Sequence, residues 1–449
     1  MKKIFTTILK RILKLLSHLI ILRFEPQVIA ITGSVGKTSA KEAVYAVLNK
    51  HFRVRKSTGN LNNELGIPLA IIGDWTEEEL KLVSRDTPTG KKRVRKIFFW
   101  FKVIFSAKKQ ILFAKKNSYP DILILEYAAD RPGDIKYLLE IAKPKIGIIT
   151  AIGEIPVHVE FFSGPEAVAK EKAKLIENLS VNNFAILNFD NELTIKMKEQ
   201  TRARVISFGL NNDSSLPTQV GLSPASLVKA EPDLKISNFE NRFQKEDETP
   251  IGISFKIEYN GSFVPVVLKN VFGRAHVYAA AIAACVGLIF DLNLVQISDA
   301  LSNHYKPVKG RMNLIKGIKE TYIIDDSYNA SPISMEESLK TFSDLPAKRK
   351  IAILGDMLEL GKYSIEAHED IGRLVAKITN ILVTIGPRAK FIAEAAKSNN
   401  FPENKILSFD SSHEACLAVQ NFIKEGDLIL IKASRAMELD KIVEEIRKM

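Results

Sequence analysis

Cysteine and histidine are scarce in this chain, which has two cysteines and seven histidines among 449 residues. Cys285 and Cys416 lie in helix-like apolar patterns and offer neither a metal-ligand spacing nor a disulfide framework. The sequence therefore predicts two core cysteines in a reducing compartment, and it excludes the disulfide-rich secreted class. Because histidine is rare, a histidine in a loop is worth weighing as a functional group.

Long apolar runs are missing from the two segments that mix apolar and basic residues, 1–24 and 91–116. Neither reaches the roughly 18 uninterrupted apolar residues of a transmembrane helix, and the first has no small-residue cleavage site after its apolar part. Two interpretations stay open. The segments are packing helices whose lysines face water, or basic amphipathic helices in peripheral contact with the inner face of a membrane.

Acidic residues are fewer than basic ones, 52 against 64, and the formal net charge is +12. Such an excess suits an anionic substrate, an anionic membrane or a nucleic acid and does not choose among them. Hydrophobic residues make up 46% of the chain, which is ample for real cores. The length predicts about two or three globular domains.

The chain is organised around VIAITGSVGKTSAKEAVYAVL, residues 28–48. Apolar residues run into a glycine turn, and a helix-periodic segment follows, so the pattern predicts strand, phosphate loop and helix. Backbone N–H groups of such a loop bind phosphate, Lys37 adds a charge near the β and γ phosphates, and the Thr38 hydroxyl holds Mg²⁺. The alternative is a glycine turn beside an exposed lysine. The predicted nucleotide-binding residues are Gly33, Ser34, Val35, Gly36, Lys37, Thr38 and Ser39.

Polar residues follow the next predicted strands. Glu126 ends an apolar strand, and in an open α/β sheet that end faces the ligand crevice. On residue type alone, His158 is an ordinary loop histidine and Lys172 a surface lysine of a helix that begins near Pro165. The Asn60, Asn62 and Asn63 cluster is by the same standard a set of turn formers.

The order of the patterns predicts an α/β protein. Residues 28–308 are expected to form a P-loop ATPase-type α/β domain with a small β-subdomain from about 211 to 261, and residues 309–449 a Rossmann-like α/β domain. The boundary falls in the Pro/Gly-punctuated passage YKPVKGRMNLIKG. Residues 1–27 form the basic amphipathic segment that precedes both.

Separate motifs from Val28 onward resemble those of the Mur ligases, the ATP-dependent amide-forming enzymes of peptidoglycan synthesis. They read TGSVGKTS, TGNLNNELGIPL, the strand-end glutamate with RPGDI, HVEFFSGPEAVAKEKAKLI, GRMN, IDDSYNASP, LGDMLELG and KASRAMELDKIV. LGDMLELG and DDSYNASP are similar to the branch that adds D-alanyl-D-alanine to a muramyl tripeptide. The resemblance implies ATP and Mg²⁺ as cofactors and an acyl phosphate made by transfer of the γ-phosphate to a substrate carboxylate. We expect a cytoplasmic monomer that takes a muramyl-peptide precursor and D-alanyl-D-alanine, with no nucleic-acid partner.

The resemblance also assigns roles to residues. It implies a catalytic set of Lys37, Glu126, His158 and Lys172, with Thr38 and Glu126 on one Mg²⁺ and His158 and a carbamate of Lys172 on a second. It implies nucleotide contacts by Arg311, Asp326 and Asn329. It implies substrate contacts by Asn60, Asn62, Asn63, Asp356, Glu359, Ser434 and Arg435.

One departure from the family pattern bears on the substrate. Mur ligases carry a uridine-nucleotide-binding domain before the P-loop strand, and here residues 1–27 stand in that place. We therefore keep as alternatives a ligase for a different amino acid or a lipid-linked acceptor, and a P-loop ATPase acting at a membrane or nucleic acid. LGDMLELG argues against a different amino acid. The ATPase alternative leaves Glu126, His158 and Lys172 unexplained.

Overall fold

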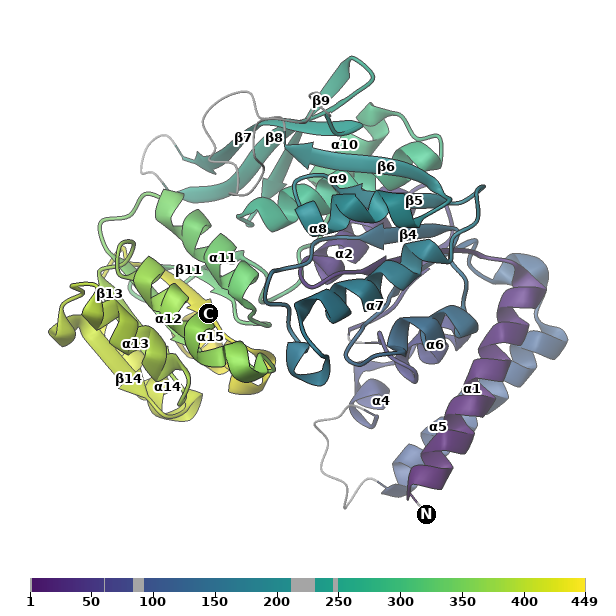
Figure 1. Ribbon diagram of the computed structural model, residues 1–449, viewed down its shortest axis with the longest axis horizontal. Coiled ribbons are helices and arrows are strands. Elements are labelled where there is room, and N and C mark those ends of the chain that lie inside the picture. The colour runs from purple at the N-terminus through teal and green to yellow at the C-terminus, as the bar shows by residue number, and fades with distance from the viewer. Residues whose placement is uncertain (1, 60, 84–92, 211–230, 245–248, 449) are drawn as a thin grey trace.

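The computed structural model describes residues 2–59, 61–83, 93–210, 231–244 and 249–448, except the side chains of residues 2, 3 and 93. Its larger sheet has the strand order β2-β3-β1-β4-β5-β6-β7-β8-β9 (Figure 1). Pairing is parallel from β2 to β7 and antiparallel from β7 to β9. The strands are β1 (Gln27–Thr32), β2 (Val54–Lys56), β3 (Ile122–Glu126), β4 (Ile146–Ile149), β5 (Phe184–Asn188), β6 (Arg204–Leu210), β7 (Leu234–Phe243), β8 (Pro250–Tyr259) and β9 (Ser262–Lys269).

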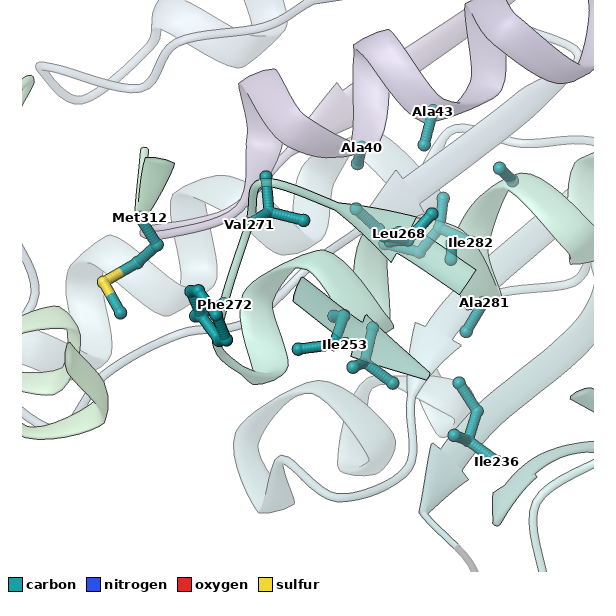
Figure 2. Packing of buried hydrophobic residues seen from close by; sticks show 14 of the residues in the cluster. Ala40, Ala43, Ile236, Ile253, Leu268, Val271, Phe272, Ala281, Ile282 and Met312 are labelled. Atoms are coloured by element: carbon teal, nitrogen blue, oxygen red, sulfur yellow. The ribbon is translucent and has the colours of Figure 1, made fainter. Parts of the chain in front are cut away.

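The predicted β-subdomain is therefore an antiparallel extension of the larger sheet, because β6 continues into it through parallel pairing with β7. Residues 211–230 and 245–248 of that prediction lie outside the described residues. On one face of the sheet, Ile29 and Ile31 pack with α2 (Lys37–Leu48), α9 (Arg274–Ile289) and α10 (Leu294–His304). Figure 2 shows small residues of α2 and α9, such as Ala40 and Ala281, beside Leu268 of β9 in this core.

The opposite face of the same strand packs against other helices, because successive strand residues point to opposite sides. Val28 and Ala30 join the core made with α1 (Lys2–Phe24), α3 (Gly66–Ile72), α5 (Arg93–Phe113) and α6 (Asp134–Ile141). Further helices are α4 (Glu77–Lys81), α7 (Pro165–Glu177) and α8 (Glu192–Ile195). Short 3-10 turns include η2 (Val159–Phe161) and η4 (Gly361–Tyr363), which contact each other.

Helices α1 and α5 run side by side at one edge of the molecule (Figure 1). Arg23 donates to the Ala114 carbonyl at 2.9 Å, and Lys116 pairs with Glu25 at 2.6 Å, so their C-terminal ends are joined. In the described part of the chain, no helix combines the length and the apolar character needed to span a bilayer. Both segments are helices, as predicted, although residues 1, 91 and 92 lie outside the described residues.

The smaller sheet has the order β10-β11-β15-β12-β13-β14, with β10 antiparallel to β11 and the other pairs parallel. Its strands are β10 (Asn313–Lys316), β11 (Tyr322–Asp326), β12 (Lys350–Gly355), β13 (Ile381–Ile385), β14 (Ile406–Phe409) and β15 (Leu428–Lys432). Its helices are α11 (Pro332–Asp344), α12 (Ser364–Val375), α13 (Ala389–Ser398), α14 (Ser412–Phe422) and α15 (Asp440–Ile446). The predicted fold class, a P-loop α/β unit followed by a Rossmann-like α/β unit, is confirmed.

Candidate active site

The loop between β1 and α2 is shaped to receive an anion. A Cβ on Gly33 would lie 2.0 Å from Thr150 Oγ1, so only glycine fits there. Gly36 has φ +81°, a left-handed conformation that favours glycine, and it precedes α2 without capping the helix through a side chain. The first N–H groups of α2 therefore have no side-chain cap from that residue, and they add to the positive end of the helix dipole. Lys37 Nζ bends back to the Gly33 carbonyl at 2.7 Å.

Glu126 lies beside this loop because β3 is the parallel neighbour of β1. Thr38 Oγ1 donates to Glu126 Oε2 at 3.2 Å, and Asn62 Nδ2 donates to Oε1 at 3.4 Å. Burial raises the pKa of Glu126, but the Lys41 and Lys37 ammonium groups and the Asn62 hydrogen bond outweigh it and leave the pKa below its ordinary value. The site thus joins a hydroxyl and a carboxylate, the hard oxygen donors that Mg²⁺ prefers, at a phosphate-binding loop.

Lys41 is a site residue that the sequence reasoning missed. Its side chain is buried at 1% exposure, and Nζ lies 3.5 Å from Glu126 Oε2 and 3.4 Å from the Gly59 carbonyl. The available signal was the i,i+4 spacing from Lys37, which places both lysines on one face of α2. Lys41 therefore balances part of the charge of Glu126.

Lys172 is buried in α7 rather than a surface lysine. Burial and the neighbouring Lys37 charge lower its pKa to about 7, against a partial opposing effect of Asp130, Glu171 and Asp134. A substantial fraction of the Lys172 amine is thus neutral near neutral pH, which is the form that attacks carbon dioxide to make a carbamate. The interpretation of Lys172 as a surface lysine is therefore wrong, because α7 packs this face against the sheet.

His158 sits in the loop after β4 with φ +70°. Its Nε2 lies 3.4 Å from Asp130 Oδ1 and its Nδ1 2.5 Å from Glu359 Oε2, so it touches both α/β units. Across the described ranges, no group of three or more His, Cys, Asp and Glu side chains converges as a metal site. His158 has two carboxylates, those of Asp130 and Glu359, beside its ring nitrogens.

The second α/β unit presents a buried ion pair to the same cleft. Asp326 Oδ2 accepts from Lys432 Nζ and from Ser338 Oγ, both at 2.6 Å, and Oδ1 accepts from the Met312 N–H at 3.2 Å. Lys432 also donates to the Asn329 carbonyl at 3.0 Å. Lys432 is a second residue that the sequence reasoning missed, although it begins the KASR motif.

Two arginines bracket one aromatic ring nearby. The Arg311 guanidinium carbon lies 4.3 Å from the centroid of the Tyr328 ring, and that of Arg435 lies 5.0 Å from it. His276, in α9, is bonded at Nδ1 to the Tyr305 hydroxyl and at Nε2 to the Arg311 carbonyl, each at 2.8 Å. Cation–π contact and a fixed backbone orient Arg311 toward the cleft.

The predicted site residues that the structure describes line one continuous cleft of about 2890 Å³, with a single exception. Asp356 is 2% exposed and does not line the cleft, because its carboxylate accepts from the N–H groups of Arg388 and Ala389 at the start of α13. A direct substrate contact for Asp356 does not fit this geometry. Asn63 lines the cleft but also caps α3 through the N–H groups of Leu65 and Gly66. Asn60 lies outside the described residues.

A phosphate loop with a threonine–glutamate pair, facing a second α/β unit across one cleft, defines a two-unit P-loop nucleotide-binding enzyme. The chain matches the Mur ligase middle domain over residues 31–82 and 106–286 and the Mur ligase glutamate ligase domain over residues 310–435. The protein therefore belongs to the Mur ligase family, and the predicted resemblance is confirmed.

Two curated relatives of this chain carry the same name. The UDP-N-acetylmuramoyl-tripeptide–D-alanyl-D-alanine ligase of Bacillus subtilis is 27% identical over 94% of this chain and 76% of its own length. The ligase of the same name from Rickettsia prowazekii is 28% identical over 93% of this chain and 77% of its own length. Among solved structures, MurF from Acinetobacter baumannii superposes with a TM-score of 0.72 at 22% identity, covering 96% of this chain and 79% of that one. MurF from Thermotoga maritima in complex with ADP superposes with a TM-score of 0.71 at 23% identity, covering 97% of this chain and 83% of that one.

Proposed function

We propose that this protein is an ATP-dependent amide ligase that adds D-alanyl-D-alanine to a muramyl-tripeptide precursor. The observation that carries the proposal is one cleft that holds the phosphate loop, the Thr38–Glu126 pair and buried Lys172. The names of the curated relatives supply the substrates. A substrate carboxylate oxygen attacks the γ-phosphate and ADP leaves. The amine of D-alanyl-D-alanine then attacks the acyl carbon, phosphate leaves, and the amine loses a proton.

The chain's own groups meet the main physical demand of this reaction, which is to bring two anions within bonding distance. The N-terminus of α2 and Lys37 would bind the triphosphate, and Thr38 and Glu126 would hold a Mg²⁺. His158 and a carbamate of Lys172 would hold a second. Bound Mg²⁺ would neutralise charge on the phosphates. Lys172 is suited to the carbamate because its buried amine has a pKa near 7.

The remaining assignments follow the walls of the cleft. Arg311, Asp326 and Asn329 would face the nucleotide, with Arg311 oriented by Tyr328. Asn62 would border the acceptor carboxylate beside Glu126. On the opposite wall Glu359, Ser434 and Arg435 would shape the amine site, and Ser434 Oγ already accepts from the Leu358 N–H at 2.9 Å.

As regards location, we propose a cytoplasmic monomer with peripheral membrane contact through 1–24 and 91–116. A lipid-linked acceptor is the second candidate substrate. It is favoured by apolar side chains in the wall of the cleft, those of Leu69, Leu80, Val83 and Trp100, which share the lining with Glu77 and Lys81. Such a wall suits the apolar part of an amphiphilic acceptor better than a free nucleotide sugar.

The test is phosphate release from ATP and Mg²⁺ by purified protein, with the muramyl tripeptide nucleotide and D-alanyl-D-alanine added singly and together. Release that requires both, with a product heavier by the dipeptide, supports the proposal. A Lys172→Ala variant should lose about 100-fold or more of this activity, and Lys170→Ala on the exposed side of α7 is its matched control. Phosphate release that ignores both substrates would overturn the ligase.

A further inference from the structure

The outer faces of α1 and α5 carry an unusual concentration of exposed apolar side chains. Among the described residues, 21 large hydrophobic side chains are exposed, and 14 of them lie on these two helices. We call this set the α1–α5 face. Its members are Ile4, Phe5, Ile8, Ile12, Leu15, Leu19, Leu22, Val94, Ile97, Phe98, Phe101, Phe105, Leu112 and Phe113. Single exposed apolar residues are normal on protein surfaces, but a concentration of this size marks an interaction surface.

The exposed residues of α1 form a stripe separate from its packing face. They recur at 8, 12, 15, 19 and 22, whereas the buried residues recur at 9, 13, 16, 20 and 24. Steps of three and four residues place each set along one side of a helix. The buried stripe already satisfies the contact with α3, α5 and α6. Folding of the chain therefore does not account for the outer stripe.

The exposed residues of α5 are larger and more aromatic. Phe98, Phe101 and Phe105 are 69%, 67% and 71% exposed, while Phe99 and Trp100 of the same helix are buried at 4% each. Of these inner aromatics, Phe99 packs against Trp75 of the loop before α4 and against Trp100. The two helices, which lie side by side (Figure 1), thus have one apolar side against the core and another exposed to solvent.

Charge identifies what the α1–α5 face meets. Neither helix contains an aspartate or glutamate, and each contains six lysines and arginines. Arg11, Lys108 and Lys109 are exposed among the apolar residues. Lys10, Lys14 and Lys102 are paired with carboxylates of other elements, and the other basic residues leave an excess of positive charge. A protein partner would ordinarily present a mixed rim, whereas a basic amphipathic surface whose two helices carry no acidic residue matches anionic lipid headgroups, with its aromatic and aliphatic side chains at the acyl boundary.

We propose that the α1–α5 face docks on an anionic lipid bilayer and lies in its interface without crossing it. This deepens the proposed membrane contact of the ligase and rests on it. Helix α5 also lines the cleft through Trp100, beside Leu80 and Val83. Docking therefore brings the part of the cleft wall that contains Trp100 near the lipid surface, where an amphiphilic acceptor is concentrated.

The experiment is flotation of the full chain with vesicles of neutral phosphatidylcholine alone or with about 30% phosphatidylglycerol, at low and high salt. The protein should float with the anionic vesicles, and less so at high salt. A Phe101→Glu/Phe105→Glu variant should bind about 10-fold more weakly or worse. The matched control is Val295→Glu/Leu417→Glu, which charges two side chains of 70% and 72% exposure on other surfaces and should leave binding unchanged.

Three outcomes would overturn the proposal. The first is no flotation with either kind of vesicle. The second is an equal loss of vesicle binding in the control variant. The third is a dimer, seen by light scattering, that dissociates in the Phe101→Glu/Phe105→Glu variant while the protein binds no vesicles. The last outcome would assign the α1–α5 face to a second copy of the chain. Ligase activity on water-soluble substrates is measured on the same samples, because it should survive both variants. Flotation without ligase activity would reject the ligase alone.

Discussion

Two buried lysine–carboxylate pairs, one in each α/β unit, differ in how completely the carboxylate is satisfied. In the second unit, the Asp326 carboxylate accepts hydrogen bonds from Lys432 Nζ and Ser338 Oγ, both at 2.6 Å, and from the Met312 N–H at 3.2 Å. In the first unit, the contacts of the Glu126 carboxylate with described residues are longer, at 3.2 Å to Thr38, 3.4 Å to Asn62 and 3.5 Å to Lys41. Both carboxylates are nearly inaccessible, at 5% and 4% exposure.

The difference suggests that Asp326 mainly stabilises the fold, whereas Glu126 can still bind a cation. The Asp326 carboxylate has two short bonds on Oδ2, one of them from the Lys432 ammonium, and a backbone N–H on Oδ1, so it has little left to offer a cation. Glu126 is held in place by contacts that are too long to use its full capacity, so it can accept a further positive ligand at low cost in broken bonds. We expect removal of charge to act mainly on activity at Glu126 and mainly on stability at Lys432.

We call Glu126 with Lys41 the loose pair and Asp326 with Lys432 the tight pair. The largest loss of activity is expected when Glu126 of the loose pair is changed. Glu126→Gln keeps the shape of the side chain but removes the charge that would hold Mg²⁺, so kcat should fall about 10³-fold or more, or about 4 kcal/mol. Steady-state phosphate release measures this. Glu199→Gln, at an exposed position, is the matched control. Full activity in Glu126→Gln would remove the distinction between the two pairs.

The tight pair should show its effect in folding. Lys432→Met leaves Asp326 buried without its cation, and the free energy of unfolding should fall by about 3–5 kcal/mol in a urea titration. The double variant Lys432→Met/Asp326→Leu should recover part of this loss, because two apolar groups need no charge partner. Exposed Lys405→Met is the control. A loss below about 1 kcal/mol would show that this pair, too, is loosely held.

A pH effect of intermediate size is expected near the tight pair. Burial lowers the pKa of His276 from 6.5 to about 4. The unfolded chain therefore binds more protons than the folded chain between these values, and stability is lost as pH falls from 6.5 toward 4, by about 3 kcal/mol in full. Urea titrations across this range should show a shallower pH dependence in His276→Gln than in the exposed-site control His413→Gln. Equal slopes would contradict the prediction.

The smallest effect should follow removal of the cation from the loose pair. In Lys41→Met, Lys37 still offsets the Glu126 charge, so we expect only about a 10-fold loss of kcat and about 1 kcal/mol of stability. Both are read from the assays already named, with Lys50→Met, at an exposed position just beyond the end of α2, as control. A stability loss as large as that of Lys432→Met would show that the 3.5 Å contact is as strong as the 2.6 Å one.

Local pattern was sufficient for most of the fold and for much of the site. The buried strands are continuous apolar runs, and the polar residues that follow them, such as Glu126, face the cleft because parallel strands end at the same sheet edge. The pattern did not show that β7–β9 join the larger sheet, since strand partners are a tertiary choice. The domain boundary at 308/309 and the assigned roles in catalysis stay predictions.

The positions and contacts of individual side chains were harder to predict from the sequence. Asp356 belongs to a recognisable motif, yet its carboxylate caps α13 away from the cleft. Lys41 and Lys432 looked like ordinary lysines in a lysine-rich chain, because burial of a charge depends on what the rest of the molecule packs over it.

By itself the sequence determined the phosphate loop, the order of strands and helices, the family and the basic amphipathic character of 1–24 and 91–116. These are properties of neighbouring residues along the chain. Only the tertiary structure decided that Lys172 is buried with a pKa near 7, that His158 meets Glu359 across the cleft, and that α1 and α5 turn a second apolar side to solvent. Each of these depends on segments far apart in the sequence, and burial changes a charge or an apolar surface only when such segments come together.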